Sequence, residues 1–130
     1  MFALSAFLTS VMIIVLVDYA WYSLTRKHFY GVISGLKDRV GLPGLVSAYA
    51  ALIAGLLFYA TLPALAGGSV WYALVLGALY GVVVYGIHAG AGYALMRGVP
   101  LRVAVAEFAH GVILMSLACM FAYLVGSALV

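Results

Sequence analysis

The chain has 130 residues, of which 68% are hydrophobic and 7% are charged, and its formal net charge is +3. A soluble domain carries about 25% charged residues because water must solvate its surface, so this composition excludes an ordinary water-soluble domain. Only helices and closed barrels satisfy every backbone polar group in lipid, and barrel strands alternate apolar with polar residues. The long unbroken apolar runs of this chain therefore predict an all-α, polytopic membrane protein.

Four apolar runs are long enough to cross a bilayer, which takes about 20 helical residues. The first run lacks the basic start of a cleavable signal peptide, so we expect it to be retained as a span. The four predicted transmembrane helices cover residues 1–24, 45–66, 70–96 and 103–128. They make up one transmembrane domain over residues 1–130, and they leave no room for a separate soluble domain.

The connection between the first two spans, residues 25–44, is expected to hold a short amphipathic helix on the cytoplasmic leaflet. Its apolar residues follow one helical face: Phe29, Val32, Ile33, Leu36 and Val40. Its basic residues would attract anionic lipid headgroups: Arg26, Lys27, Lys37 and Arg39. Gly31 and Gly35 weaken a helix, so an irregular basic loop stays open as the alternative.

The remaining connections are short. Spans two and three are separated only by Gly67, Gly68 and Ser69, and spans three and four by residues 97–102. Every Lys and Arg of the chain lies in the first or the third connection. The positive-inside rule makes that side cytoplasmic, so we expect a multi-pass protein of the cell inner (cytoplasmic) membrane with both termini outside.

Small residues recur four apart, a spacing that lets helix backbones approach closely in lipid. The third span has Gly77 with Gly81 and Gly86 with Gly90, and the chain has further repeats at Ala51/Gly55 and Ala118/Ala122/Gly126. These faces predict that the third span is the most enclosed helix, or that the chain self-associates. The single cysteine, Cys119, is interpreted as a small packing residue.

Four ionisable residues interrupt the predicted spans: Asp18, His88, Glu107 and His110. Measured at helical rise from the nearest basic boundary residue, all four lie about 8–13 Å inside the bilayer. They therefore form one layer in its cytoplasmic half, contributed by three helices. Intramembrane ionisable groups are costly and usually face the bundle interior.

Two tyrosines, Tyr22 and Tyr85, lie within one helical turn of this layer and complete the candidate site. The layer is consistent with a proton relay or cation site, with a metal site made by Glu107, His110, His88 and Asp18, or with a haem held by the two histidines. A hydrogen-bonded network that only fixes the helices in register is the structural alternative. The other aromatic residues near the span ends, Trp21 among them, are interpreted as interfacial anchors.

The chain has no nucleotide-binding glycine loop, nucleophile elbow or zinc-ribbon spacing, and no nucleic-acid partner is expected. Three hypotheses for its function remain: a small transport protein that handles protons or small ions, a non-enzymatic accessory subunit or scaffold of a larger membrane complex, and a metal-dependent membrane enzyme with a lipid-soluble substrate. The enzyme is the least favoured, and no cofactor is assigned. Because four short helices enclose little volume, we expect a homo-oligomer or a complex with a partner membrane protein, surrounded by membrane lipid.

Three short motifs resemble those of the domain-of-unknown-function 2177 family of small bacterial membrane proteins. Residues 17–30, VDYAWYSLTRKHFY, resemble the end of the family's first span, with Asp18, Trp21, Phe29 and Tyr30 in its pattern. Residues 97–101, RGVPL, resemble its turn, with Val99 in an aromatic place. Residues 106–111, AEFAHG, resemble its acidic motif, with Glu107 for Asp and His110 for Trp.

This resemblance implies four spans and supports a role for Asp18 and Glu107, but it implies no activity. The third span departs from the family pattern, because residues 88–92 read HAGAG where the family carries a polar Tyr-Asp-Leu-Thr-Asn stretch. If the family shares a ligand site, the departure implies that this chain has altered it.

Overall fold

The computed structural model describes residues 1–25, 41–96 and 98–129, and all of its regular structure there is helical. The elements in chain order are α1 (Phe2–Thr25), α2 (Leu42–Leu56), the π-helical turn η2 (Leu57–Thr61), α3 (Leu62–Gly67), α4 (Val70–Leu95) and α5 (Leu101–Ala128).

Because α2, η2 and α3 follow one another without a break, the chain has four long helices that are apolar enough to cross a membrane. The prediction of an all-α protein with four transmembrane helices is therefore confirmed. Each helix begins and ends within three residues of its predicted span. The predicted amphipathic segment, centred on residues 29–40, lies outside the described residues.

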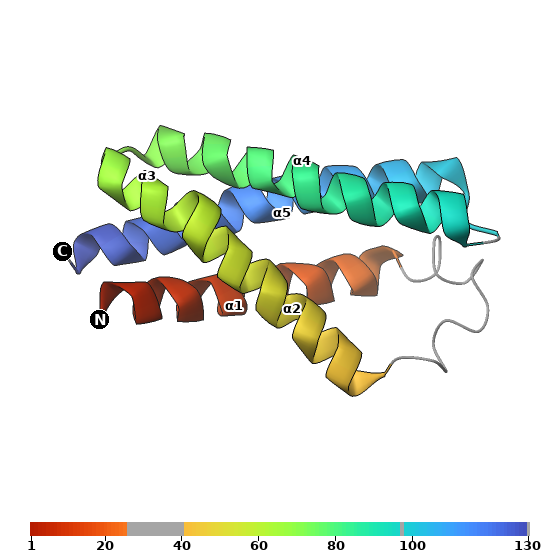
Figure 1. Cartoon of the computed structure of the whole chain (residues 1–130), viewed down its shortest axis with the longest axis horizontal. Helices are drawn as coiled ribbons and strands as arrows, with labels where there is room; N and C mark the ends of the chain where they lie inside the picture. Colours follow the sequence, from red (N-terminus) through yellow and green to blue (C-terminus); the bar gives the residue numbers. More distant parts are fainter. Residues whose placement is uncertain (26–40, 97, 130) are drawn as a thin grey trace.

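The four long helices run up and down, so that both termini lie at one end of the bundle and the connection between α4 and α5 lies at the other (Figure 1). α4 and α5 pack against each other along their length, and α1 packs on α5. α2 lies obliquely across α1, and its N-terminal end diverges from the other helices (Figure 1). The arrangement is thus tight at the end that holds the termini and open at the end where α2 begins.

Glycine sets the close contact between α4 and α5. A Cβ atom on Gly77 would lie 2.6 Å from the Met115 carbonyl oxygen, and one on Gly81 would lie 2.8 Å from the Cα atom of Val112. Any side chain at these positions would therefore push the backbones apart. Gly90, in contrast, has open space around it. Of the two predicted glycine pairs in this span, Gly77 with Gly81 makes the helix contact.

The prediction that the third span is the most enclosed helix is wrong. Ten residues of α5 are buried, against five of α4. The reason is that α5 packs against both α4 and α1, and its Ala118, Cys119 and Ala122 are fully buried. Small alanines let neighbouring helices approach as glycine does, so counting glycines alone selected the wrong helix.

The second spanning helix contains a π-helical turn directly before Pro63. Proline has no N–H to donate to the carbonyl four residues earlier and widens or kinks the helix around it. Here Leu62 N–H bonds to the Leu57 carbonyl, five residues back. The helix ends at Gly68, which adopts a left-handed conformation, and the Ser69 hydroxyl caps α4 by accepting from Tyr72 N–H. The left-handed conformation of Gly68 and the cap from Ser69 thus account for the predicted tight turn.

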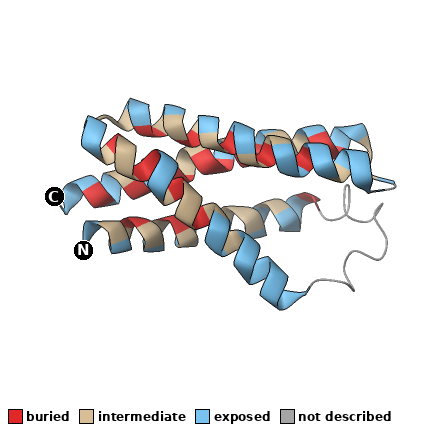
Figure 2. Ribbon diagram, in the orientation of Figure 1, coloured by how far each residue is buried: buried red, intermediate tan, exposed pale blue. Residues whose placement is uncertain are grey.

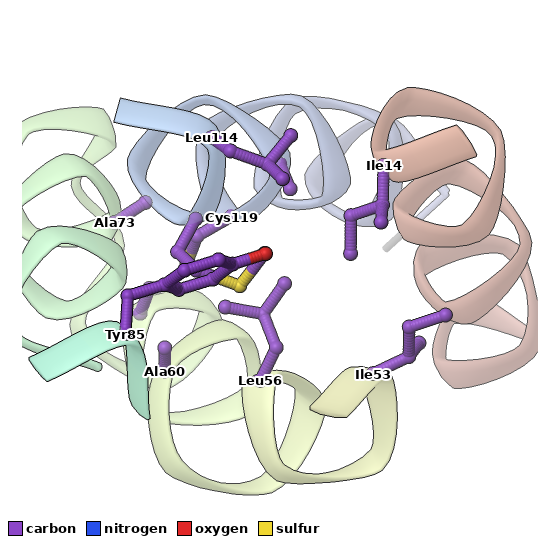
Figure 3. Close-up of a cluster of buried hydrophobic side chains, with 11 residues drawn as sticks. Ile14, Ile53, Leu56, Ala60, Ala73, Tyr85, Leu114 and Cys119 are labelled. Carbon is purple, nitrogen blue, oxygen red and sulfur yellow. The ribbon is translucent and has the colours of Figure 1, made fainter. Parts of the chain in front are cut away.

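The apolar core lies where η2 and the end of α2 meet α1, α4 and α5. Ile14, Leu56 and Leu114 are fully buried there and point toward one another (Figure 3). The start of α2 contributes nothing to this core, because residues 42–48 are all exposed (Figure 2). This part of α2 is instead on the outer wall of a pocket.

Candidate functional site

A pocket of about 780 Å³ lies between α1, α2, α4 and α5, at the end of the bundle where α2 diverges. Its walls come from the C-terminal part of α1, the N-terminal half of α2, the C-terminal half of α4 and the start of α5. All six residues of the candidate site from the sequence line it: Asp18, Tyr22, Tyr85, His88, Glu107 and His110. The structure therefore gathers the candidate residues of three spanning helices around one pocket, and the remaining spanning helix, which begins with α2, also lines it.

Asp18 is the centre of the polar contacts in this pocket. Its Oδ1 atom lies 2.9 Å from Nε2 of His110 on α5, and its Oδ2 atom accepts a 2.5 Å hydrogen bond from the Tyr49 hydroxyl on α2. The Asp18 side chain is 22% exposed and that of His110 7%. The Asp18 carboxylate thus links α1, α2 and α5. It is more exposed to the pocket than the imidazole of His110 is.

Trp21, one turn beyond Asp18, makes the second link between α1 and α5. Its indole N–H donates a 3.1 Å hydrogen bond to Oε1 of Glu107. Its ring also stacks on the imidazole of His110, with centroids 4.3 Å apart and planes 10° apart. Because Glu107 and His110 are three residues apart on one helix face, a single indole contacts both.

The α4 wall carries two tyrosines and a histidine. Tyr85 projects into the middle of the bundle (Figure 3) over Gly111, where any Cβ atom would overlap its ring. His88 is exposed and meets Tyr85 edge-on, with centroids 6.1 Å apart. The Tyr80 hydroxyl donates a 2.9 Å hydrogen bond to the Leu52 carbonyl of α2. These contacts fix the back of the pocket.

Tyr49, Trp21 and Tyr80 take part in these contacts but were not among the candidate site residues from the sequence. Trp21 was interpreted as an interfacial anchor, whereas its ring packs against His110. The Asp-x-x-Trp spacing could have revealed it, since residues three apart share a helix face. Tyr49 and Tyr80 lie in spans whose neighbouring residues are apolar, and nothing in the sequence sets them apart from other membrane tyrosines.

The ligand set proposed for a metal is not gathered at one point. Among the described residues, no three His, Cys, Asp or Glu side chains converge closely enough to hold a metal ion. Asp18 and His110 pair with each other, Glu107 bonds to Trp21, and His88 lies against Tyr85. The chemistry open to this arrangement is hydrogen bonding, proton exchange and attraction of charge.

The end of α1, which carries Asp18, and the start of α5, which carries Glu107, also contain two of the motifs noted in the sequence. A family model described as a predicted membrane protein (DUF2177) matches residues 3–124. The chain belongs to the DUF2177 family. The match covers all four spanning helices and the whole pocket lining, so this DUF2177 protein is an integral, multi-pass membrane protein. No curated protein and no solved structure matches the chain.

Proposed function

We propose that this DUF2177 protein is a small transport protein that takes up and releases protons at the Asp18–His110 pair. The observation that carries the proposal is the 2.9 Å contact between these two side chains at the wall of an intramembrane pocket. Ionisable groups within membrane spans are expensive and mark proton relays and ion pathways. The Asp18–His110 pair borders a pocket, so the proton-binding groups can be reached through that pocket.

The chemistry of the pair follows from its contacts. The Asp18 carboxylate only accepts hydrogen bonds, so Nε2 of His110 carries the shared proton and Nδ1 is the atom that takes up a second one. Once both nitrogens are protonated, the imidazolium faces a carboxylate on one side and the indole of Trp21 on its ring face. Both neighbours attract a cation. Among the described residues, the other ionisable groups that line the pocket are Tyr19, Tyr22, Tyr49, Tyr80, Tyr85, His88 and Glu107, which come from all four spanning helices.

The hydrogen bond from Tyr49 gives a means to couple proton uptake to movement. The part of α2 that precedes Tyr49 has little packing of its own, because residues 42–48 are exposed. A carboxylate accepts from Tyr49 and His110 together, whereas a protonated Asp18 is a weaker acceptor. Passage of the Nε2 proton from the doubly protonated His110 to Asp18 therefore weakens the contact that holds this part of α2 against α1. A purely structural subunit, the alternative, has no need of such a pocket.

The test is proton flux across liposomes that contain the purified protein. A pH gradient is imposed, and its decay is followed with a trapped pH-sensitive dye for the wild type, Asp18→Asn and Glu107→Gln. We expect faster decay for the wild type than for Asp18→Asn, which keeps the size of the side chain but cannot ionise. Equal decay for the two would contradict the proposal, provided that both proteins insert to the same extent.

We also propose that the protein resides in the cytoplasmic membrane with its basic connections inside and both termini outside. The charge distribution supports this orientation, since every Lys and Arg lies in the first or third connection. A homo-oligomer is a further proposal, supported by the open face at Gly90 on α4. Labelling of cysteines placed at each terminus in intact cells tests the orientation, and native mass spectrometry tests the oligomer.

A further inference from the structure

The pocket is larger than proton transfer alone requires. A proton moves along hydrogen bonds between side chains and needs no cavity. The pocket holds about 780 Å³, within the range of about 300–1,000 Å³ found for sites that bind drug-sized molecules. A second solute, larger than an inorganic ion, would fill it.

The charged side chains of the lining indicate whether the solute is a cation or an anion. Among the described lining residues there are two carboxylates, Asp18 and Glu107, and no Lys or Arg. The two lining histidines, His88 and His110, carry positive charge only when protonated. Among these described residues an anion would therefore meet carboxylates and no permanent cation, whereas a cation would be attracted to Asp18.

The remaining lining selects the chemical class. Six aromatic side chains line the pocket: Tyr19, Trp21, Tyr22, Tyr49, Tyr80 and Tyr85. Aromatic faces attract cations, and sites rich in them recognise quaternary ammonium groups. Between them lie apolar side chains such as Leu45, Leu52 and Val84. An inorganic cation prefers a cage of oxygen ligands, whereas here Asp18 pairs with His110 and Tyr49, Glu107 bonds to Trp21, and no three acidic, histidine or cysteine side chains of the described residues are grouped.

We infer that the pocket binds a lipophilic organic cation, with its charged group beside Asp18 and its apolar part among the tyrosines. This inference rests on the proposed function, because it names the solute that the proton-exchanging site would carry. Binding of the cation next to Asp18 favours loss of the proton from His110, since two positive charges would share one carboxylate. Tyr19 on α1, Leu45 on α2 and His88 on α4 line the pocket and are also exposed, so the pocket opens at the end of the bundle where α2 diverges (Figure 1).

The test compares two probes of the same shape and different charge. Benzyltrimethylammonium is a cation, and neopentylbenzene is its neutral counterpart, in which carbon replaces the nitrogen. The protein is placed in nanodiscs of zwitterionic lipid. Trp71→Phe leaves Trp21, in the pocket, as the reporter, because the chain has only two tryptophans and Trp71 lies in the first turn of α4, whose start is at the opposite end of the bundle (Figure 1).

We expect saturable binding of benzyltrimethylammonium at least about tenfold tighter than that of neopentylbenzene, the equivalent of one favourable charge contact. Asp18→Asn should weaken binding of the cation about tenfold or more and leave binding of the neutral probe unchanged. Tyr22→Leu, in the pocket, should weaken binding of the cation, whereas Tyr59→Leu, at an exposed position outside the lining, should not. Equal affinity for the two probes, or no effect of Asp18→Asn in a variant with wild-type helicity, would overturn the inference.

The two proposals fail separately. A protein with proton flux that depends on Asp18 but with no preference for the cation would contradict only the ligand class. A protein that binds the cation through Asp18 but shows no flux that depends on this residue would contradict only the transport role.

Discussion

The indole of Trp21 lies parallel to the imidazole of His110, with ring centroids 4.3 Å apart. The two residues come from the first and last spanning helices, and the same indole donates a hydrogen bond to Glu107. Trp21 is thus placed to report spectroscopically on the charge of the ring against which it packs.

The fluorescence of Trp21 is expected to depend on pH. An imidazolium quenches indole fluorescence more strongly than a neutral imidazole does, so a change in the charge of His110 changes the emission of Trp21, whose ring stacks on it. In the Trp71→Phe protein, emission should fall as the pH is lowered. The same titration of Trp71→Phe with His110→Gln is the control, and an unchanged pH profile there would show that His110 is not the quencher.

Tyr49→Phe is expected to loosen the first half of α2. The change removes the hydroxyl that donates to Asp18 and leaves the ring in place. Hydrogen bonds within membranes contribute about 1 kcal/mol, so backbone exchange with deuterium over residues 42–52 should rise roughly fivefold. Tyr59→Phe, an exposed tyrosine further along the same helix, should leave exchange as in the wild type. Equal exchange in the two variants would mean that Tyr49 does not hold α2.

Gly77→Ala is expected to destabilise the protein by about 2 kcal/mol, because the added methyl group would meet the Met115 carbonyl oxygen on α5. Unfolding of the protein in mixed micelles by increasing denaturing detergent measures this. Gly92→Ala is the matched control on the same helix, since its methyl group would enter open space and alanine favours a helix. A loss of stability at position 92 as large as that at position 77 would contradict the close α4–α5 contact.

Gly111→Ala is expected to disturb the pocket through Tyr85. A methyl group at position 111 would overlap the Tyr85 ring, and the ring can relieve the overlap only by moving toward the cavity. The variant should be less stable by about 1–3 kcal/mol. Adding Tyr85→Leu should recover part of that loss, because the smaller side chain leaves room for the methyl group. If the two changes are simply additive in the unfolding free energy, the contact between these residues is not the cause.

The four long helices, and the positions of Asp18 and His110 along them, could be predicted from the sequence because both follow from distances along one helix. Apolar runs give the span, and the rise per residue from a basic boundary places Asp18 and His110 at one level. The partner of Asp18 on α2 could not be predicted in this way. Tyr49 lies in a span without ionisable residues, and its contact depends on how α2 crosses α1, which hydropathy does not encode.

Helix packing was the second feature that the sequence left open. Gly77 and Gly86 occur in the same spacing pattern, yet only the first meets the backbone of α5, while Gly86 has a single side-chain neighbour, Phe108, at 3.6 Å. Which small face makes a contact depends on the rotation of the helix about its axis. That rotation is set by the whole bundle, so a local pattern of small residues predicts that a close contact exists but not where.

The loose packing of the first half of α2 has a consequence for how such proteins diversify. Leu45 and Ala48 line the pocket but lie outside the core that holds the bundle together. Substitutions at these positions alter the shape of the cavity at little cost in folding free energy. A lineage built on this scaffold can therefore acquire new selectivity by changing residues on one helix, while the other three are inherited unchanged.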